Sequence, residues 1–135
     1  MVCIYCGGKT RVFNSRRQAR NNNVWRRRKC LSCGAIFTSV EAPELASSLS
    51  VNRLGTYEPF LEDLLFTEIL LALQDRKDCY SASRELTNSV IRNLVKEEGA
   101  EFTPRQISQA TAKVLKRFSK RAYQRYAAEH SSLSA

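Results

Sequence analysis

The sequence predicts an α+β protein, in which a small N-terminal unit of short antiparallel strands precedes a mainly α-helical unit with a β-hairpin. Two observations lead to this prediction. Four cysteines form two Cys-x2-Cys pairs within the first 33 residues, and apolar residues recur at helical spacing in the second half. The chain of 135 residues is 43% apolar and 26% charged, which suits two small globular units and excludes a membrane span.

The paired cysteines predict a metal centre in the first unit. Two residues between the members of a pair allow a tight turn to direct both thiolates at one ion, and a glycine follows each pair. The start of the chain shows no charged and apolar leader, which favours the reducing cytoplasm, where thiolates bind metals. Two redox disulfides or an iron centre are the alternatives to one structural Zn²⁺ per chain. The predicted zinc ligands are Cys3, Cys6, Cys30 and Cys33.

Between these pairs, β-branched and aromatic residues predict strands over residues 11–15, 24–29 and 35–40, with an asparagine-rich turn over 18–23. Together with the metal, these strands predict a zinc ribbon. Residues 41–50 have the proline and serine content of a linker, which places the domain boundary near Pro43, between a domain over residues 1–42 and a domain over residues 50–130.

The net charge of +9 lies entirely in the ribbon. Residues 1–39 contain nine Lys or Arg and no Asp or Glu, whereas residues 40–135 contain thirteen of each sign. A small surface with no nearby acid to pair its cations predicts a polyanionic partner, with nucleic acid first and a solvated charged surface as the alternative. Strand alternation would send Arg26 and Arg28 to one face and Arg27 and Lys29 to the other. Trp25 can pack beneath the arginines or stack on a base. The DNA-binding candidates are Arg16, Arg17, Arg26, Arg27, Arg28 and Lys29.

The second unit begins with an expected hairpin over residues 50–53 and 56–60, around Leu54-Gly55. A strongly apolar helix is expected over 62–74, buried on several sides. The next helix is expected to be capped by Ser81 or Ser83 and to end at Gly99. A third begins at Thr103-Pro104, a fourth covers residues 121–130, and the last five residues are expected to fray.

Nothing in the sequence predicts an enzyme. Cys79 is left over after the metal site and is interpreted as a small buried apolar residue. His130 is the only histidine, and it lies near the end of the chain. The sequence shows no phosphate-binding glycine loop, paired-histidine helix or nucleophile elbow.

Several segments in combination identify a family: CIYCG, NSR, VWRRRKCLSCGAIFTSVE, VNRLGTYEPF and AYQRYAA. Together they resemble the NrdR family of bacterial transcriptional repressors of ribonucleotide reductase genes, over nearly the whole chain. The resemblance implies a ribbon that binds operator DNA. It also implies that the second unit is an ATP-cone, a module of a small hairpin and a helical bundle in which bound ATP or dATP sets the oligomeric state. The implied partners are double-stranded DNA, adenine nucleotides and further copies of the chain, with no membrane, in the bacterial cytoplasm at the nucleoid. The implied nucleotide-binding residues are Val51, Asn52, Arg53, Gly55, Glu58, Phe60, Tyr123 and Tyr126.

The chain departs from the family pattern at three positions, and at one of them Leu54 stands where the family has an aspartate or asparagine. Asn52 and Leu64 stand where the family has lysines, and a triphosphate pocket depends on such cations. Two further hypotheses therefore stay open: a DNA-binding regulator whose cone has lost nucleotide binding and only oligomerises, and a structural RNA-binding zinc-ribbon protein.

Overall fold

The protein is α+β, as predicted, and divides into two compact units between Pro43 and Glu44. The structure is a computed structural model that describes residues 1–130. The fraying expected for residues 131–135 lies outside the described residues. Among the helices of the described chain, none combines the length and the apolar character that crossing a bilayer requires.

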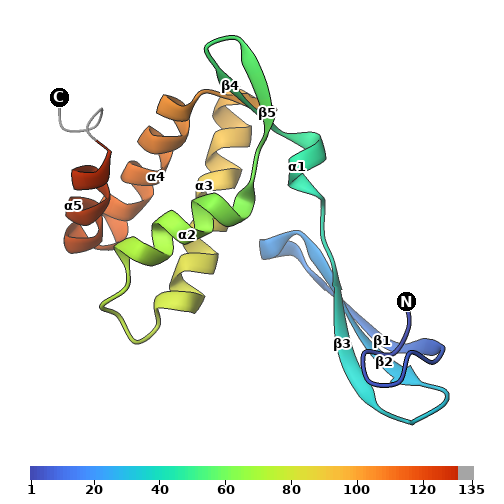
Figure 1. Cartoon of the computed structure of the whole chain (residues 1–135). Coiled ribbons are helices and arrows are strands. Elements are labelled where there is room, and N and C mark those ends of the chain that lie inside the picture. Colours follow the sequence, from blue (N-terminus) through green and yellow to red (C-terminus); the bar gives the residue numbers. More distant parts are fainter. Residues whose placement is uncertain (131–135) are drawn as a thin grey trace. The chain divides into compact units, whose positions relative to one another are not determined.

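The first unit is one antiparallel sheet in the order β1-β2-β3 (Figure 1). Its strands are β1 (Thr10–Gln18), β2 (Asn23–Cys30) and β3 (Ile36–Glu41). The predicted asparagine-rich turn is a short 3-10 segment, η1 (Ala19–Asn21), closed by Asn22 in the left-handed region at φ 49°. The three predicted strands are confirmed. The linker expected from residue 41 begins later, because Glu41 still pairs with Val24 in the sheet.

Strand β1 contains a β-bulge that sets which side chains share a face. Val12 pairs with Arg28, but the next pair is Asn14 with Arg27, so Phe13 is the extra residue. A bulge reverses the alternation of the residues that follow it relative to those before it. The faces of this sheet therefore cannot be assigned by counting along β1.

The second unit contains a small mixed sheet in the order β5-β4-β6. A single-turn helix, α1 (Leu45–Ser48), occupies part of the predicted linker and precedes β4 (Ser50–Arg53) and β5 (Thr56–Pro59). The hairpin turn at Leu54-Gly55 has φ 52° and 91°, which is the geometry of a two-residue hairpin and explains the glycine. Strand β6 (Glu101–Phe102), which pairs in parallel with β4, was not predicted because it is only two residues long.

Four longer helices complete the second unit: α2 (Glu62–Ala72), α3 (Cys79–Glu98), α4 (Pro104–Phe118) and α5 (Lys120–Glu129). Thr103 caps α4 and Pro104 begins it, as predicted, and Gln106 completes a capping box that was not predicted. The predicted cap of α3 was wrong. Asp78 stands at its N-cap without a side-chain hydrogen bond, and Ser83 is fully buried inside the helix.

The core of the second unit joins the sheet to the helices. Phe60 and Phe102 meet edge to face, with ring centroids 5.6 Å apart and an interplanar angle of 84°. Such pairs exceed the stabilisation from buried area alone. The other buried core residues are Leu49, Val51, Leu65, Ile69, Ala72, Leu73, Val90, Ile91, Leu94, Ala112, Leu115, Ala122 and Tyr126.

Helix α2 is less buried than its composition predicted. Leu65 and Ile69 face the core, but Leu64 and Leu71 are 59% and 60% exposed. The expectation of burial on several sides was therefore wrong, because only one face of α2 meets α3 and α5.

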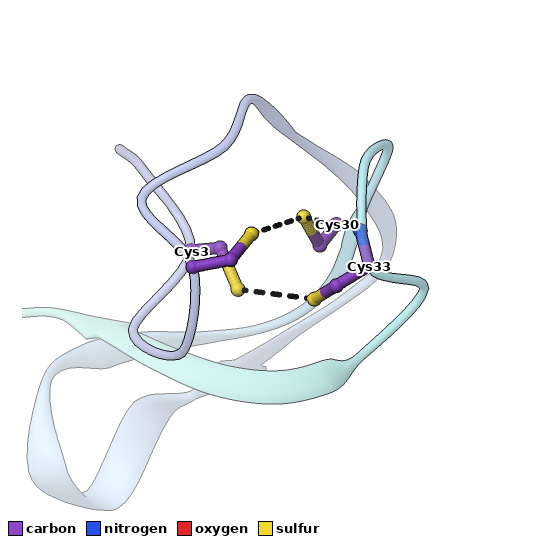
Figure 2. A group of neighbouring side chains, drawn as sticks. Cys3, Cys30 and Cys33 are labelled. Atoms are coloured by element: carbon purple, nitrogen blue, oxygen red, sulfur yellow. Dashed lines mark hydrogen bonds between the residues drawn. The ribbon is translucent and has the colours of Figure 1, made fainter.

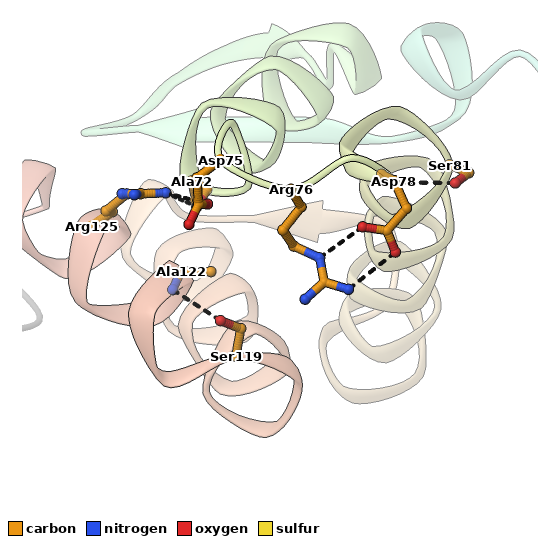
Figure 3. A network of polar contacts seen from close by, with 8 residues as sticks. All are labelled: Ala72, Asp75, Arg76, Asp78, Ser81, Ser119, Ala122 and Arg125. Carbon is orange, nitrogen blue, oxygen red and sulfur yellow. Dashed lines mark hydrogen bonds and ion pairs between the residues drawn. The ribbon is translucent and has the colours of Figure 1, made fainter.

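Hydrogen bonds and ion pairs connect the loop between α2 and α3 to α5 (Figure 3). Arg76 donates two hydrogen bonds to the Asp78 carboxylate, at 2.8 and 3.1 Å, and Asp75 accepts from both Arg125 and Arg121. The hydrogen bond from Arg125, followed by that from Arg121, holds the pKa of Asp75 below its usual value. This network fixes α5 against the end of α2.

Candidate metal centre and nucleic-acid interface

The four predicted metal ligands converge on one point in the first unit. The Sγ atoms of Cys3, Cys6, Cys30 and Cys33 all lie within 4.8 Å of one another. Cys3 Sγ is 3.8 Å from Cys33 Sγ (Figure 2). Cys6 Sγ is 3.4 Å from Cys30 Sγ. A tetrahedral Zn²⁺ with Zn–S bonds of about 2.3 Å requires sulfurs about 3.8 Å apart, so the cluster has the dimensions of such a site.

Both Cys-x2-Cys turns have the same backbone geometry. In each, the glycine four residues after the first cysteine donates to the carbonyl of that cysteine: Gly7 to Cys3 at 3.0 Å and Gly34 to Cys30 at 3.2 Å. Both glycines have φ 74°, a conformation that strains other residues. Backbone amides also donate to sulfur, from Tyr5 to Cys3 Sγ at 3.4 Å and from Ser32 to Cys30 Sγ at 3.3 Å. These amides favour thiolates.

The pKa values of two of the cysteines favour a bound cation in the cluster. Hydrogen bonds from the backbone amides of Cys33 and Ser32 lower the pKa of Cys30 to about 6, even though burial opposes this. An amide hydrogen bond from Ala35 lowers the pKa of Cys33, but burial and the three neighbouring cysteines outweigh it and raise that pKa to about 11. Four thiolates at these distances repel one another, and a divalent ion relieves the repulsion. The all-sulfur donor set fits a structural zinc that leaves no open position for catalysis.

The predicted DNA-binding residues lie on two strands of the ribbon sheet and on both of its faces. Arg26 and Arg28 of β2 share one face, where Arg26 contacts Ser15 at 3.0 Å and Arg28 contacts Ser39 at 2.8 Å. Arg27 lies on the other face, over the ring of Trp25 at 5.8 Å from its centroid. This confirms the predicted alternation along β2. Arg16 pairs with Trp25 and Arg17 with Val24, so these neighbours also lie on opposite faces.

One expectation about this surface was wrong. The ribbon cations were expected to have no nearby acid, but Arg26 forms an ion pair with Glu41 at 3.1 Å. The cause is the extension of β3, which carries Glu41 into the sheet beside the arginine strand. The carboxylate-free surface is therefore confined to one face.

The predicted nucleotide-binding residues fall into two separate groups. The hairpin residues are tied to one another: Arg53 Nε lies 2.8 Å from Glu58 Oε2, and Asn52 Oδ1 accepts from the Gly55 amide at 2.8 Å. Val51 and Phe60 are buried in the core at the base of the hairpin.

The two tyrosines of α5 form the second group. Tyr126 is 3% exposed, and burial raises its pKa. It lines a cavity of about 690 Å³ between α2 and α5, whereas Tyr123 lines a cavity of about 330 Å³ beside α3 and α4. None of the six hairpin candidates lines either cavity.

Comparison with known proteins identifies the chain. Residues 1–41 match the family model described as "Transcriptional repressor NrdR-like, N-terminal domain". The transcriptional repressor NrdR of Symbiobacterium thermophilum is 33% identical over 94% of this chain and 85% of its own length. The chain belongs to the NrdR family. The NrdR proteins of Rhodospirillum centenum and Staphylococcus carnosus are 34% and 30% identical, each over 94% of this chain and over 83% and 82% of their lengths.

NrdR membership confirms the resemblance and covers both units. The family model ends at residue 41, two residues before the boundary at Pro43, while the full-length relatives align across the helical unit as well. These relatives are named as repressors of transcription, which agrees with a regulatory rather than an enzymatic protein.

Two residues singled out in the sequence lie in the helical unit. Cys79 begins α3 and is half-buried against the core, so it is only partly the buried apolar residue expected. His130 stacks on Tyr126 with ring centroids 4.0 Å apart, and its Nε2 lies 3.8 Å from Glu68. The sequence did not mark Arg11, which pairs with Lys29 on the ribbon, as a DNA-binding candidate. The bulge at Phe13 decides which face of the sheet Arg11 shares with the later residues of β1, and no sequence signal marks that bulge.

Proposed function

We propose that this chain represses ribonucleotide reductase genes by binding their operator DNA through its zinc ribbon, as a homo-oligomer whose size is set by ATP or dATP in the second unit. The observation that carries the proposal is the concentration of charge. All nine excess cations lie in residues 1–39, and seven of them lie on the strands of a sheet held by a four-cysteine cluster, in a member of a repressor family.

The physical role of the metal in this function is structural. The first unit buries only Cys3, Cys30 and Phe37 as a cluster, which is too small a core to hold a basic sheet of this size. Metal binding in small zinc peptides contributes about 10–16 kcal/mol at neutral pH, which is ample to fold the ribbon. Zinc would then present the arginines to phosphates without taking part in chemistry.

The test of DNA binding is fluorescence anisotropy with a labelled duplex from the promoter of a ribonucleotide reductase operon. A scrambled duplex and an RNA of equal length are the controls. We expect tighter binding to the promoter duplex, with a loss of about a thousandfold between 50 and 200 mM salt if six phosphates are neutralised. Replacing Arg26, Arg27 and Arg28 together by alanine should weaken binding and flatten the salt dependence. Equal affinity for all three nucleic acids would contradict operator recognition, and a preference for RNA would favour an RNA-binding ribbon.

Specific features favour a second candidate, a DNA-binding regulator whose second unit oligomerises without nucleotide. Asn52, at a family lysine position, is engaged in the hairpin turn, and Arg53 is paired with Glu58. Leu64, at the other lysine position, is exposed.

Native mass spectrometry distinguishes the two candidates, because one spectrum reports zinc, bound nucleotide and the number of subunits. The proposed function predicts bound ATP or dATP and a change in subunit number when one replaces the other. An unchanged oligomer with no bound nucleotide would favour the second candidate.

A further inference from the structure

The ribbon sheet has two faces of different chemistry, which the strand register defines. Side chains that pair across antiparallel strands lie on the same face. One face, named here the Trp25 face, has three rows across β1, β2 and β3: Arg16–Trp25–Val40, Asn14–Arg27–Thr38 and Arg11–Lys29–Ile36. The opposite face, named here the Cys30 face, has the rows Arg17–Val24–Glu41, Ser15–Arg26–Ser39 and Val12–Arg28–Phe37, and Cys30 continues it.

The two faces differ in the hydrogen bonds and ion pairs that their Lys and Arg side chains already make. On the Cys30 face, Arg26 is bound by Ser15 and Glu41, and Arg28 is bound by Ser39. One end of this face packs on the cysteine cluster, where Phe37 is 7% exposed. A polyanion that bound here would have to compete with the Glu41 carboxylate and would meet repulsion from it.

The Trp25 face carries four cations and no carboxylate. The side chains of Arg11, Arg16 and Lys29 make no hydrogen bond or ion pair with any described residue, and the Arg27 side chain contacts only the Thr38 hydroxyl, at 3.3 Å, and the Trp25 ring. The bulge at Phe13 produces this gathering, because a regular β1 would have put Arg11 on the same face as Arg17 and opposite Arg16.

The uncharged residues of the Trp25 face also suit a nucleic acid. Asn14 and Thr38 flank Arg27 in the middle row and offer an amide and a hydroxyl between the cations. Ile36 and Val40 are 46% and 57% exposed, so the outer strand offers apolar contact rather than packing inward. Cations for phosphates, with amide, hydroxyl and apolar groups among them for base edges and sugars, are the elements of duplex recognition.

We propose that the Trp25 face, and not the Cys30 face, is the surface of the ribbon that contacts DNA, with Arg11, Arg16, Arg27 and Lys29 on phosphates and Trp25 at the interface. This inference rests on the proposed function, since it assumes that the ribbon binds a duplex. It separates residues that are neighbours in sequence: Arg27 and Lys29 contact the duplex, while Arg26 and Arg28 brace the sheet from behind.

Two double variants on the same strand test the assignment with equal loss of charge. They are Arg27→Gln with Lys29→Gln on the Trp25 face and Arg26→Gln with Arg28→Gln on the Cys30 face. Each phosphate contact contributes about −0.9 to the slope of log affinity against log salt concentration. At 0.1 M salt one contact therefore raises the affinity about eightfold relative to about 1 M salt. The Trp25-face variant should therefore lose about sixtyfold per ribbon and flatten the slope by about two. The Cys30-face variant should lose less than about fivefold, with its slope nearly unchanged.

The readout is anisotropy with the promoter duplex over a range of salt, on protein that retains one zinc per chain. A larger loss in the Cys30-face variant, or equal losses in both, would overturn the face assignment and leave the proposed function in place. Failure of the zinc-loaded wild-type chain to bind the duplex would overturn the proposed function itself.

An independent measurement uses the single tryptophan of the chain. Because Trp25 is the only indole, its fluorescence reports on this face alone. Saturating promoter duplex should reduce quenching of Trp25 by acrylamide severalfold. Quenching that is unchanged when the protein is fully bound would refute the assignment, because the indole would then face away from the DNA.

Discussion

Replacing Phe102 by alanine should cost the second unit a large part of its stability. Phe102 is fully buried, its ring meets Phe60 edge to face, and its strand β6 pairs with β4. Truncating a buried phenylalanine to alanine costs about 3–5 kcal/mol, to which the loss of the aromatic pair contributes. A unit of about ninety residues has roughly 4–13 kcal/mol in total, so the variant should lose at least about a fifth of it.

Urea denaturation followed by far-ultraviolet circular dichroism measures this loss, because the helices lie in the second unit. Trp25 fluorescence in the same titration reports on the ribbon and should be unaffected. Leu71→Ala is the matched control, since Leu71 is 60% exposed and its truncation should change stability by less than about 0.5 kcal/mol. A loss below about 1 kcal/mol for Phe102→Ala, or a similar loss in both variants, would refute the view that this ring joins the sheet to the helices.

Three further predictions concern the metal, a cap and an ion pair. Removal of zinc by a strong chelator should unfold the ribbon, seen as a shift in Trp25 fluorescence and loss of DNA binding, while the helical dichroism persists; retention of the ribbon without metal would contradict a structural role. Thr103→Ala removes the capping box of α4 and should destabilise the second unit by about 1 kcal/mol in urea, whereas Thr103→Ser should be nearly neutral. The pKa of Asp75 is lowered in the folded state by Arg125 and Arg121, so its contribution to stability is present above the unfolded pKa of about 3.9 and is lost as pH falls through the lower folded value. The stability difference between wild type and Asp75→Asn should therefore be constant near neutral pH and shrink below about pH 4; a difference that does not depend on pH would exclude the ionic contribution.

Short-range patterns were enough to predict the metal centre and the start of α4. Two Cys-x2-Cys pairs specify two closed turns, and the structure brings their four sulfurs together. Thr103-Pro104 specifies a helix start through groups within three residues of one another. In both cases the stabilising contacts are local in sequence or depend on one ion, so no knowledge of distant packing was needed.

Features that depend on pairing between distant segments could not be predicted. The bulge at Phe13 exists only relative to β2, and Phe102 is a strand residue only because Val51 lies beside it. The exposure of Leu64 follows from which helices cover α2, not from its own sequence. The division of the ribbon cations into two faces belongs to this class, since it follows from the register of three strands.

Strand β4 is the first strand after the boundary at Pro43, and it lies in the middle of its sheet. Backbone hydrogen bonds hold its neighbourhood from both sides, with the Ser50 amide bound to Ala100 and the Phe60 amide bound to Leu49. A force transmitted along the chain from the first unit would therefore act on the hydrogen bonds at both edges of β4 at the same time, in shear. These bonds would not break one after another. A mechanical load carried from a DNA-bound ribbon would reach the helical body through a strand anchored on both edges.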